Sequence, residues 1–179
     1  FFALVPNLFG AKAAAECGLT KIDTVISVSE SHNKANINRT VSESLEGLTA
    51  IRQELPDMEI ILSLATAFTC PFEGITPIDN VLSIIRKGVD LGIHQFCLAD
   101  TIGQADPLMV RNTAKAVLKE FPNEHFELHI HDTRGMGLVS TLAGIEAGIN
   151  SVQAAVGGLG GCPFATGASG NVASEDLIF

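Results

Sequence analysis

The stretch at residues 126–132 reads FELHIHD and alternates apolar with polar side chains. A period of two is typical of a β-strand, so we expect the apolar residues on one face and Glu127, His129 and His131 on the other. The two imidazoles would then project from the same face, about two residues of strand rise apart.

Apolar, β-prone runs alternate with longer amphipathic stretches along the whole chain, which is the pattern of repeated βα units. We expect strands at residues 2–5, 23–28, 59–63, 95–99, 126–130 and 151–156, and helices at residues 10–17, 41–55, 77–91, 107–120 and 137–147. Thr40 or Ser42 would cap the second helix, while Pro77 and Pro107 suit a first helical turn. Each helix would return the chain to the next parallel strand through a right-handed crossover.

Such units build either a doubly wound sheet or a (β/α)8 TIM barrel. Polar residues gather after nearly every expected strand, where barrel enzymes place their active sites: Asn7, 29–32, Thr66, 100–101, 131–132 and 157–171. No G-x-G-x-x-G fingerprint follows the first strand, which lowers the doubly wound alternative. We therefore expect residues 1–179 to form a single, partial TIM-barrel domain of the α/β class. About six of eight units are visible, and the first two are expected to be missing.

Composition excludes several classes of protein. Hydrophobic residues make up 46% and charged residues 17% of the chain, which describes a globular protein. The net charge of −9, with 11 Lys and Arg in no run, argues against a nucleic-acid partner. No apolar run reaches the roughly 18 residues that span a membrane.

The cysteines and the first residue bear on where the protein works. Four cysteines without C-x-x-C spacing suit free thiols in a reducing compartment, so we expect a cytoplasmic protein, or one of the mitochondrial matrix if the source is eukaryotic. The chain opens at Phe1 in an apolar run, from which we expect that the true N-terminus is not present.

His129 and His131 are candidate metal ligands, because two convergent imidazoles beside an acid can bind a divalent cation. Neutral histidines combined with carboxylate or amide oxygens leave room for Mg or Mn, whereas a closed zinc site would favour thiolates. The alternative is a pair of polar or core histidines without a metal.

Asp100 and Cys162 are the other candidates for chemistry. Asp100 ends an expected strand and suits a base or a group that orients water, with a turn or helix-capping role as the alternative. Cys162 lies in the glycine-rich stretch 157–171, where glycines permit close ligand approach. No protease-like spacing of His and acid accompanies it, which favours proton transfer over nucleophilic attack.

Three segments, at 98–103, 129–133 and 158–171, resemble the 3-hydroxy-3-methylglutaryl-CoA lyases, which belong to the DRE-TIM metallolyase group. The likeness continues through residues 36–38 and 70–74 and covers essentially the whole chain. It implies a (β/α)8 barrel in which His129, His131 and Asn171 ligate Mg or Mn. It also implies that Cys162, on a mobile loop, takes part in acid–base chemistry, with Asp100 and His129 in proton transfer. The implied reaction is retro-Claisen cleavage of an acyl-CoA substrate into acetyl-CoA and acetoacetate, in a barrel that is often a homodimer.

One departure from the family pattern concerns its first barrel strand, which carries an Arg-Asp pair; no Arg-Asp dipeptide occurs in these 179 residues. We interpret the sequence as a fragment of a competent carbon–carbon lyase. The alternatives are a related aldolase or lyase acting on another 3-hydroxyacyl-CoA or a 2-oxo acid, and an inactive barrel fragment that serves as a binding module.

Overall fold

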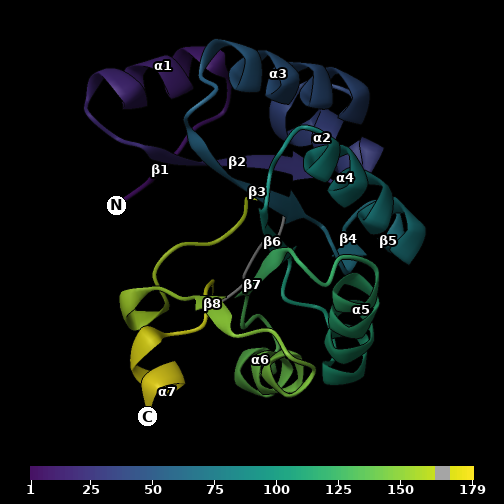
Figure 1. Cartoon of the computed structure of the whole chain (residues 1–179). Helices are drawn as coiled ribbons and strands as arrows, with labels where there is room; N and C mark the ends of the chain where they lie inside the picture. The colour runs from purple at the N-terminus through teal and green to yellow at the C-terminus, as the bar shows by residue number, and fades with distance from the viewer. Residues whose placement is uncertain (164–169) are drawn as a thin grey trace.

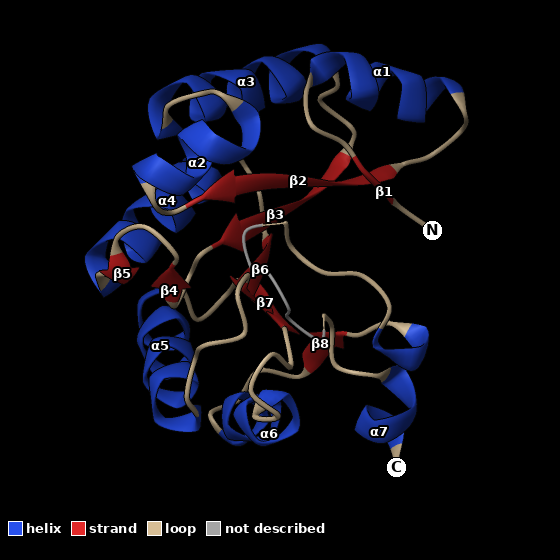
Figure 2. Ribbon diagram, turned by 180° about the vertical axis from the view of Figure 1, so that it is seen from behind, coloured by secondary structure: helices blue, strands red, loops and turns tan. Residues whose placement is uncertain are grey.

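The computed structural model describes residues 1–163 and 170–179, and within them one parallel sheet organises the chain. Its order is β1-β2-β3-β6-β7-β8, and every neighbouring pair is parallel. The strands are β1 (Ala3–Leu4), β2 (Lys21–Ser27), β3 (Glu59–Ala65), β6 (Gln95–Asp100), β7 (His125–Ile130) and β8 (Ser151–Gln153). The sheet curls, with helices along its outer side (Figures 1 and 2). This is the predicted partial TIM barrel, with β1 and β8 at the two edges of the described sheet.

The helices complete the βα units. They are α1 (Leu8–Glu16), α2 (Glu30–Ile37), α3 (Val41–Glu54), α4 (Ile78–Asp90), α5 (Pro107–Glu120), α6 (Gly137–Glu146) and α7 (Ser174–Ile178), with a short 3-10 helix, η1, at Val156–Gly158. All five predicted helices and six predicted strands are present. α2, α7 and the small antiparallel hairpin of β4 (Thr69–Cys70) with β5 (Gly74–Ile75) were not predicted.

Local signals explain several helix starts. Thr40 and Glu43 form a reciprocal capping box at the start of α3, which satisfies two backbone N–H groups. Pro107 occupies the first turn of α5 behind the Asp106 cap, as predicted. Pro77 differs, because it precedes α4 as its N-cap and does not lie in the first turn.

The hydrophobic core lies between the outer face of the sheet and the helices. The alternation predicted for β7 is confirmed, since Phe126, Leu128 and Ile130 are each at most 2% exposed and belong to this core. Phe96 on the neighbouring strand stacks on Phe126 with ring centroids 5.7 Å apart. Because the outer face of the sheet packs against the helices, the opposite, concave face is the one available to functional side chains.

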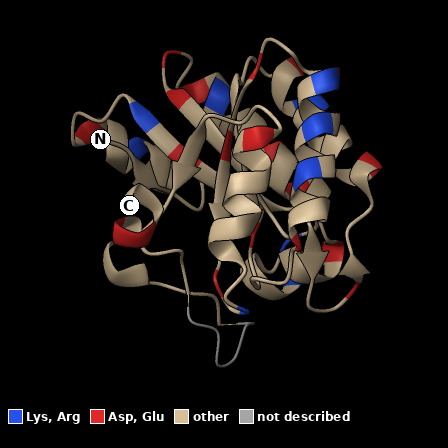
Figure 3. Ribbon diagram, turned by 90° about the horizontal axis from the view of Figure 1, so that it is seen from below, with Lys and Arg blue, Asp and Glu red and all other residues tan. Residues whose placement is uncertain are grey.

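The solvent-facing surface carries most of the charge. Figure 3 shows basic and acidic residues interspersed on the helices. Within the described residues, no helix combines the length and apolar character needed to cross a membrane.

Candidate active site

A cavity of about 280 Å³ lies on the concave face of the sheet. Residues of every strand of the parallel sheet reach it, from Leu4 on β1 to Gln153 on β8. Its lining combines polar and apolar groups: Leu4, Asp23, Val25, His32, Asn36, Ser63, Ala65, Cys97, Ala99, Thr101, His129, His131, Gln153, Gly161, Cys162 and Pro163. Three of the five predicted site residues therefore share one cavity: His129, His131 and Cys162.

The two histidines converge on one point. Nε2 of His129 and Nε2 of His131 are 3.2 Å apart, and their ring centroids are 5.2 Å apart. Burial lowers the pKa of His129, while its hydrogen bond to Gln153 raises it. Burial and the nearby His129 lower the pKa of His131 to about 4. Both rings are accordingly neutral at about pH 7, the state in which imidazole binds a metal.

Asn171 is brought beside His131 by backbone pairing. The two residues form an isolated antiparallel bridge, an arrangement that places their side chains on the same side. The Asn171 amide nitrogen donates to the Leu159 carbonyl at 2.7 Å, so Oδ1, at the other end of the amide, points away from Leu159. Within residues 1–163 and 170–179, this buried Oδ1 has no hydrogen-bond partner. An oxygen acceptor is thus left unused near the histidine pair.

Glycines allow this approach of the two ends of the loop. A Cβ on Gly170 would clash with the Gly160 carbonyl oxygen, and one on Gly160 would lie 2.8 Å from Asn171 Nδ2. Both residues also have positive φ, at +95° and +100°. The glycine-rich pattern therefore permits backbone to pack on backbone and holds the Asn171 amide in place.

Cys162 is half-buried at the rim of the same cavity. It follows Gly161, which also lines the cavity, so the glycine-rich stretch contributes both residues to the cavity wall. Residues 164–169 of that predicted loop lie outside the described residues.

Asp100 is placed differently. Its carboxylate accepts backbone N–H groups of Gln104 at 3.1 Å and Ala105 at 2.9 Å, and the side chain is 1% exposed. Burial raises the pKa of this carboxyl, and the backbone donors oppose the rise. Among the described residues, the lining of the cavity does not include Asp100. The observed contacts match the turn-forming alternative, and the proton-transfer role remains a prediction.

Asp132, the acid beside the histidine pair, also serves local structure. Its Oδ1 accepts the backbone N–H of Gly137 at 2.6 Å, where α6 begins. A carboxylate at this helix start satisfies an otherwise free donor.

Two residues that were not predicted as part of the site line the cavity beneath the histidines. Gln153 contacts His129, with Oε1 3.1 Å from Nδ1, and its amide nitrogen donates to Glu127 Oε2 at 3.0 Å. Asp23 is 5% exposed, and burial raises its pKa to about 6, with Glu127 adding to the rise and hydrogen bonds from Ser63 and Gln153 opposing it. Gln153 is the last residue of a three-residue strand, which gave too short a pattern to predict it.

The arrangement fits a divalent cation. Two octahedral ligands at about 2.1 Å from one cation lie about 3 Å apart, close to the separation of the two Nε2 atoms. Two neutral imidazoles with an amide oxygen form a donor set suited to Mg or Mn. A group of three or more His, Cys, Asp or Glu able to hold a metal is not found among the described residues, so the third ligand has to be Asn171 or come from elsewhere.

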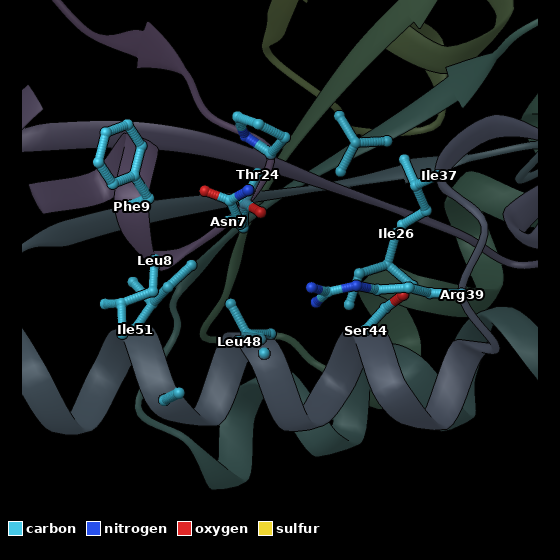
Figure 4. Close-up of a pocket in the computed structure, with 14 residues that line it drawn as sticks. Asn7, Leu8, Phe9, Thr24, Ile26, Ile37, Arg39, Ser44, Leu48 and Ile51 are labelled. Carbon is cyan, nitrogen blue, oxygen red and sulfur yellow. The ribbon is translucent and has the colours of Figure 1, made fainter. Parts of the chain in front are cut away.

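A second cavity, of about 290 Å³, lies on the helix side of β2 (Figure 4). Its lining mixes aliphatic side chains of α1, β2 and α3 with polar ones, among them Arg39, whose guanidinium points into the cavity. None of the five predicted site residues lines it.

Comparisons with known proteins agree with this architecture. The family described as HMGL-like matches residues 3–179. The chain is 39% identical over 181 residues to the hydroxymethylglutaryl-CoA lyase YngG of Bacillus subtilis (strain 168), covering 100% of this chain and 60% of that protein. It is also 39% identical over 180 residues to the (R)-citramalyl-CoA lyase of Chloroflexus aurantiacus, covering 99% of this chain and 57% of that protein.

A solved structure gives the same fold. An HMG-CoA lyase from Acinetobacter baumannii, in complex with coenzyme A and 3-methylmalate, superposes with a TM-score of 0.94 at 43% identity, covering 99% of this chain and 59% of that one. The chain thus spans about three-fifths of the length of these relatives.

Proposed function

Because the chain belongs to the HMGL-like family, we propose that it carries most of the active site of a divalent-metal-dependent carbon–carbon lyase. The proposed substrate is 3-hydroxy-3-methylglutaryl-CoA, cleaved to acetyl-CoA and acetoacetate. The observation that carries the proposal is the convergence of two neutral imidazoles, with Nε2 atoms 3.2 Å apart, in the cavity that Cys162 also lines.

His129, His131 and Asn171 are the residues that would hold Mg or Mn. When bound, the cation supplies Lewis-acid polarisation of the substrate's tertiary hydroxyl oxygen. The three side chains present their donors without a charge of their own, because burial lowers the pKa of both imidazoles and the amide is neutral. A carboxylate ligand or a cationic group from outside these 179 residues is compatible with this donor set.

The cleavage itself is a heterolytic, redox-neutral step with two proton transfers. A base takes the proton of the tertiary hydroxyl, its oxygen forms a carbonyl, and the bond between the carbinol carbon and the carbon next to the thioester breaks. The electron pair of that bond moves into the thioester enolate, which an acid protonates to give acetyl-CoA. Cys162 is the acid that we propose, since it lines the cavity and a thiol can serve as a proton donor.

Two substitutions test this proposal in an assay for acetoacetate release with added Mn²⁺. Cys162→Ser is expected to lower kcat on the order of a hundredfold while leaving Mn²⁺ affinity intact, because it removes a general acid and no ligand. His131→Ala is expected to weaken Mn²⁺ binding in calorimetric titration. An unchanged turnover in Cys162→Ser, or an identical isotherm for His131→Ala, would remove the corresponding role.

A second candidate function is the cleavage of a related acyl-CoA, such as citramalyl-CoA. The relative from Chloroflexus aurantiacus bears that name at the same 39% identity. The same bond-breaking chemistry serves both substrates, so the cavity wall and not the histidine pair would select between them. Parallel kcat/KM measurements on the two acyl-CoA thioesters, with a pyruvate-type aldol substrate as a third, separate the candidates. Mn²⁺ binding without turnover of any of them would favour the binding-module alternative.

A further inference from the structure

We propose that Gln153, anchored by Glu127, acts as a positioning residue that fixes the ring tautomer of His129. The tautomer that it selects places the proton on Nδ1 and leaves a lone pair on Nε2, directed at His131. This inference deepens the proposed function, on which it rests, because an Nε2 lone pair is what a cation held by both rings requires.

The first step is the orientation of the Gln153 amide. Its two ends have two different neighbours, the Glu127 carboxylate at 3.0 Å and the His129 ring nitrogen Nδ1 at 3.1 Å. The amide nitrogen is the end that faces Glu127, because it donates to the carboxylate oxygen Oε2, which is an acceptor. The reverse orientation would set the amide oxygen against a carboxylate oxygen, which is repulsive. Glu127 therefore dictates that the carbonyl end of Gln153 faces His129.

The second step is the proton on the imidazole. A carbonyl oxygen cannot donate, so the contact between Gln153 Oε1 and His129 Nδ1 is a hydrogen bond only if Nδ1 carries the proton. In a neutral imidazole the other nitrogen is then unprotonated.

The third step is the rigidity of the chain of contacts from Glu127 through Gln153 to His129, which we call the relay. His129 and Gln153 are directly paired across β7 and β8, and Glu127 is paired with Ser151 two residues earlier in the same register. The three side chains thus stand on one face of two hydrogen-bonded strands, and all three are partly or largely buried. Outer partners held in this way orient a metal-binding histidine and raise its basicity, and their loss typically costs about 10–100-fold in metal affinity.

The decisive measurement uses the metal-free wild-type protein. Ring-nitrogen chemical shifts of His129, from long-range proton–nitrogen correlation spectra, distinguish a protonated Nδ1 from a protonated Nε2. The proposal expects Nδ1–H. A predominant Nε2–H tautomer overturns it, and neither result depends on turnover or on metal.

Variants then test whether Gln153 is the cause. Gln153→Leu removes the contact with His129 and the hydrogen bonds to Glu127 and Asp23 at similar volume. We expect mixed tautomers of His129 and Mn²⁺ affinity lowered by about tenfold or more. The double swap Glu127→Gln with Gln153→Glu rebuilds the relay with its roles exchanged, since the carboxylate introduced at position 153 could accept from both Nδ1–H and the amide introduced at position 127. We expect the swap to restore the single tautomer and bring Mn²⁺ affinity close to that of the wild type.

Ser151→Ala provides the matched control, because Ser151 precedes Gln153 by two positions on the same face of β8. It is expected to leave tautomer and affinity unchanged. A Gln153→Leu protein with the wild-type tautomer, or a folded swap variant as weak as Gln153→Leu, overturns the proposal. If the tautomers behave as expected but acyl-CoA is not cleaved, the proposed function fails and the positioning role stands.

Discussion

The two cavities on either side of β2 are nearly equal in volume but differ in the titratable groups that line them. The inner one measures about 280 Å³ and the outer one about 290 Å³. Adjacent residues of β2 divide between them, since Asp23 lines the inner cavity and Thr24 the outer one. The inner cavity gathers buried titratable groups whose pKa values are shifted, whereas the outer one mixes apolar side chains with Arg39 and uncharged polar groups. The comparison shows that volume alone does not identify a site; the ionisable and partnerless polar atoms do.

The inner cavity carries a cost in stability, and Asp23→Asn should remove it. Burial raises the pKa of Asp23 from 3.8 to about 6, so the native state binds a proton more tightly than the unfolded chain. Stability is therefore lost as pH rises from about 4 through about 6, and the loss is complete at about pH 7. We expect the variant to be more stable there by at most about 3 kcal/mol, measured by urea unfolding.

The same substitution should have little effect at about pH 4, where the wild-type carboxyl is largely protonated in the native state. This acid measurement serves as the internal control. An equal gain at both pH values would mean that packing and not ionisation is responsible. A destabilised variant at neutral pH would mean that the hydrogen bonds from Ser63 and Gln153 outweigh the cost of burying the carboxylate.

Two asparagines, one beside the histidine pair and one at the outer cavity, form a matched pair for substitution. Asn171 presents a buried Oδ1 without a partner in the described parts of the chain, whereas Asn7 in the outer cavity caps α1 by accepting from Gly10 N at 3.0 Å. Asn171→Ala should lower Mn²⁺ affinity roughly 10–100-fold, at least as much as loss of an outer partner. Asn7→Ala should leave affinity unchanged and cost about 1 kcal/mol of stability.

Calorimetric titration and urea unfolding of both variants separate the two effects. Equal losses of Mn²⁺ affinity would break the distinction between the cavities. An unaffected isotherm for Asn171→Ala would take the amide oxygen out of the proposed donor set.

The strand pattern predicted the histidine pair because β7 follows the simplest rule, one apolar and one polar face. Alternation alone was therefore enough to place His129 and His131 on the concave side, and they share the cavity. Gln153 was not predicted as a site residue because the strand Ser151–Gln153 is too short for alternation to be recognised. The predicted strand also extended to the first residue of η1. Strand pattern is informative only where the strand is long enough to repeat it.

α2 was not predicted for a different reason. Helix prediction relies on an apolar stripe, and α2 is instead held by polar side chains. His32 Nδ1 lies 2.7 Å from Ser27 Oγ, and Asn33 accepts the Ser27 N–H at 3.0 Å. Asn33 also donates to Ser44 Oγ on α3 at 2.8 Å. Such tertiary hydrogen bonds join segments that are separate in the sequence, so the local spacing of apolar and polar residues does not predict them.

Asp100 provides a third case for the comparison of the cavities, because it is a buried carboxylate that lines neither of them. Asp100→Asn should cost about 1–2 kcal/mol in urea unfolding, because an amide has one oxygen to replace the two that accept from Gln104 and Ala105. If the contacts are its whole role, turnover of the folded variant should be nearly unchanged. A large fall in kcat with little loss of stability would instead support the predicted proton-transfer role.

The smallest effect is expected from Gly47→Ala at the wall of the outer cavity. Gly47 lies inside α3, where alanine is favoured over glycine by roughly 0.5–1 kcal/mol. The added Cβ would approach Arg39 Nη1 to 3.2 Å, but this is the end of an exposed side chain that can move aside. We expect a small gain in urea stability with unchanged Mn²⁺ binding and acyl-CoA cleavage. If filling this cavity altered either one, the outer cavity would have to be coupled to the inner site through β2, the strand whose adjacent residues line both.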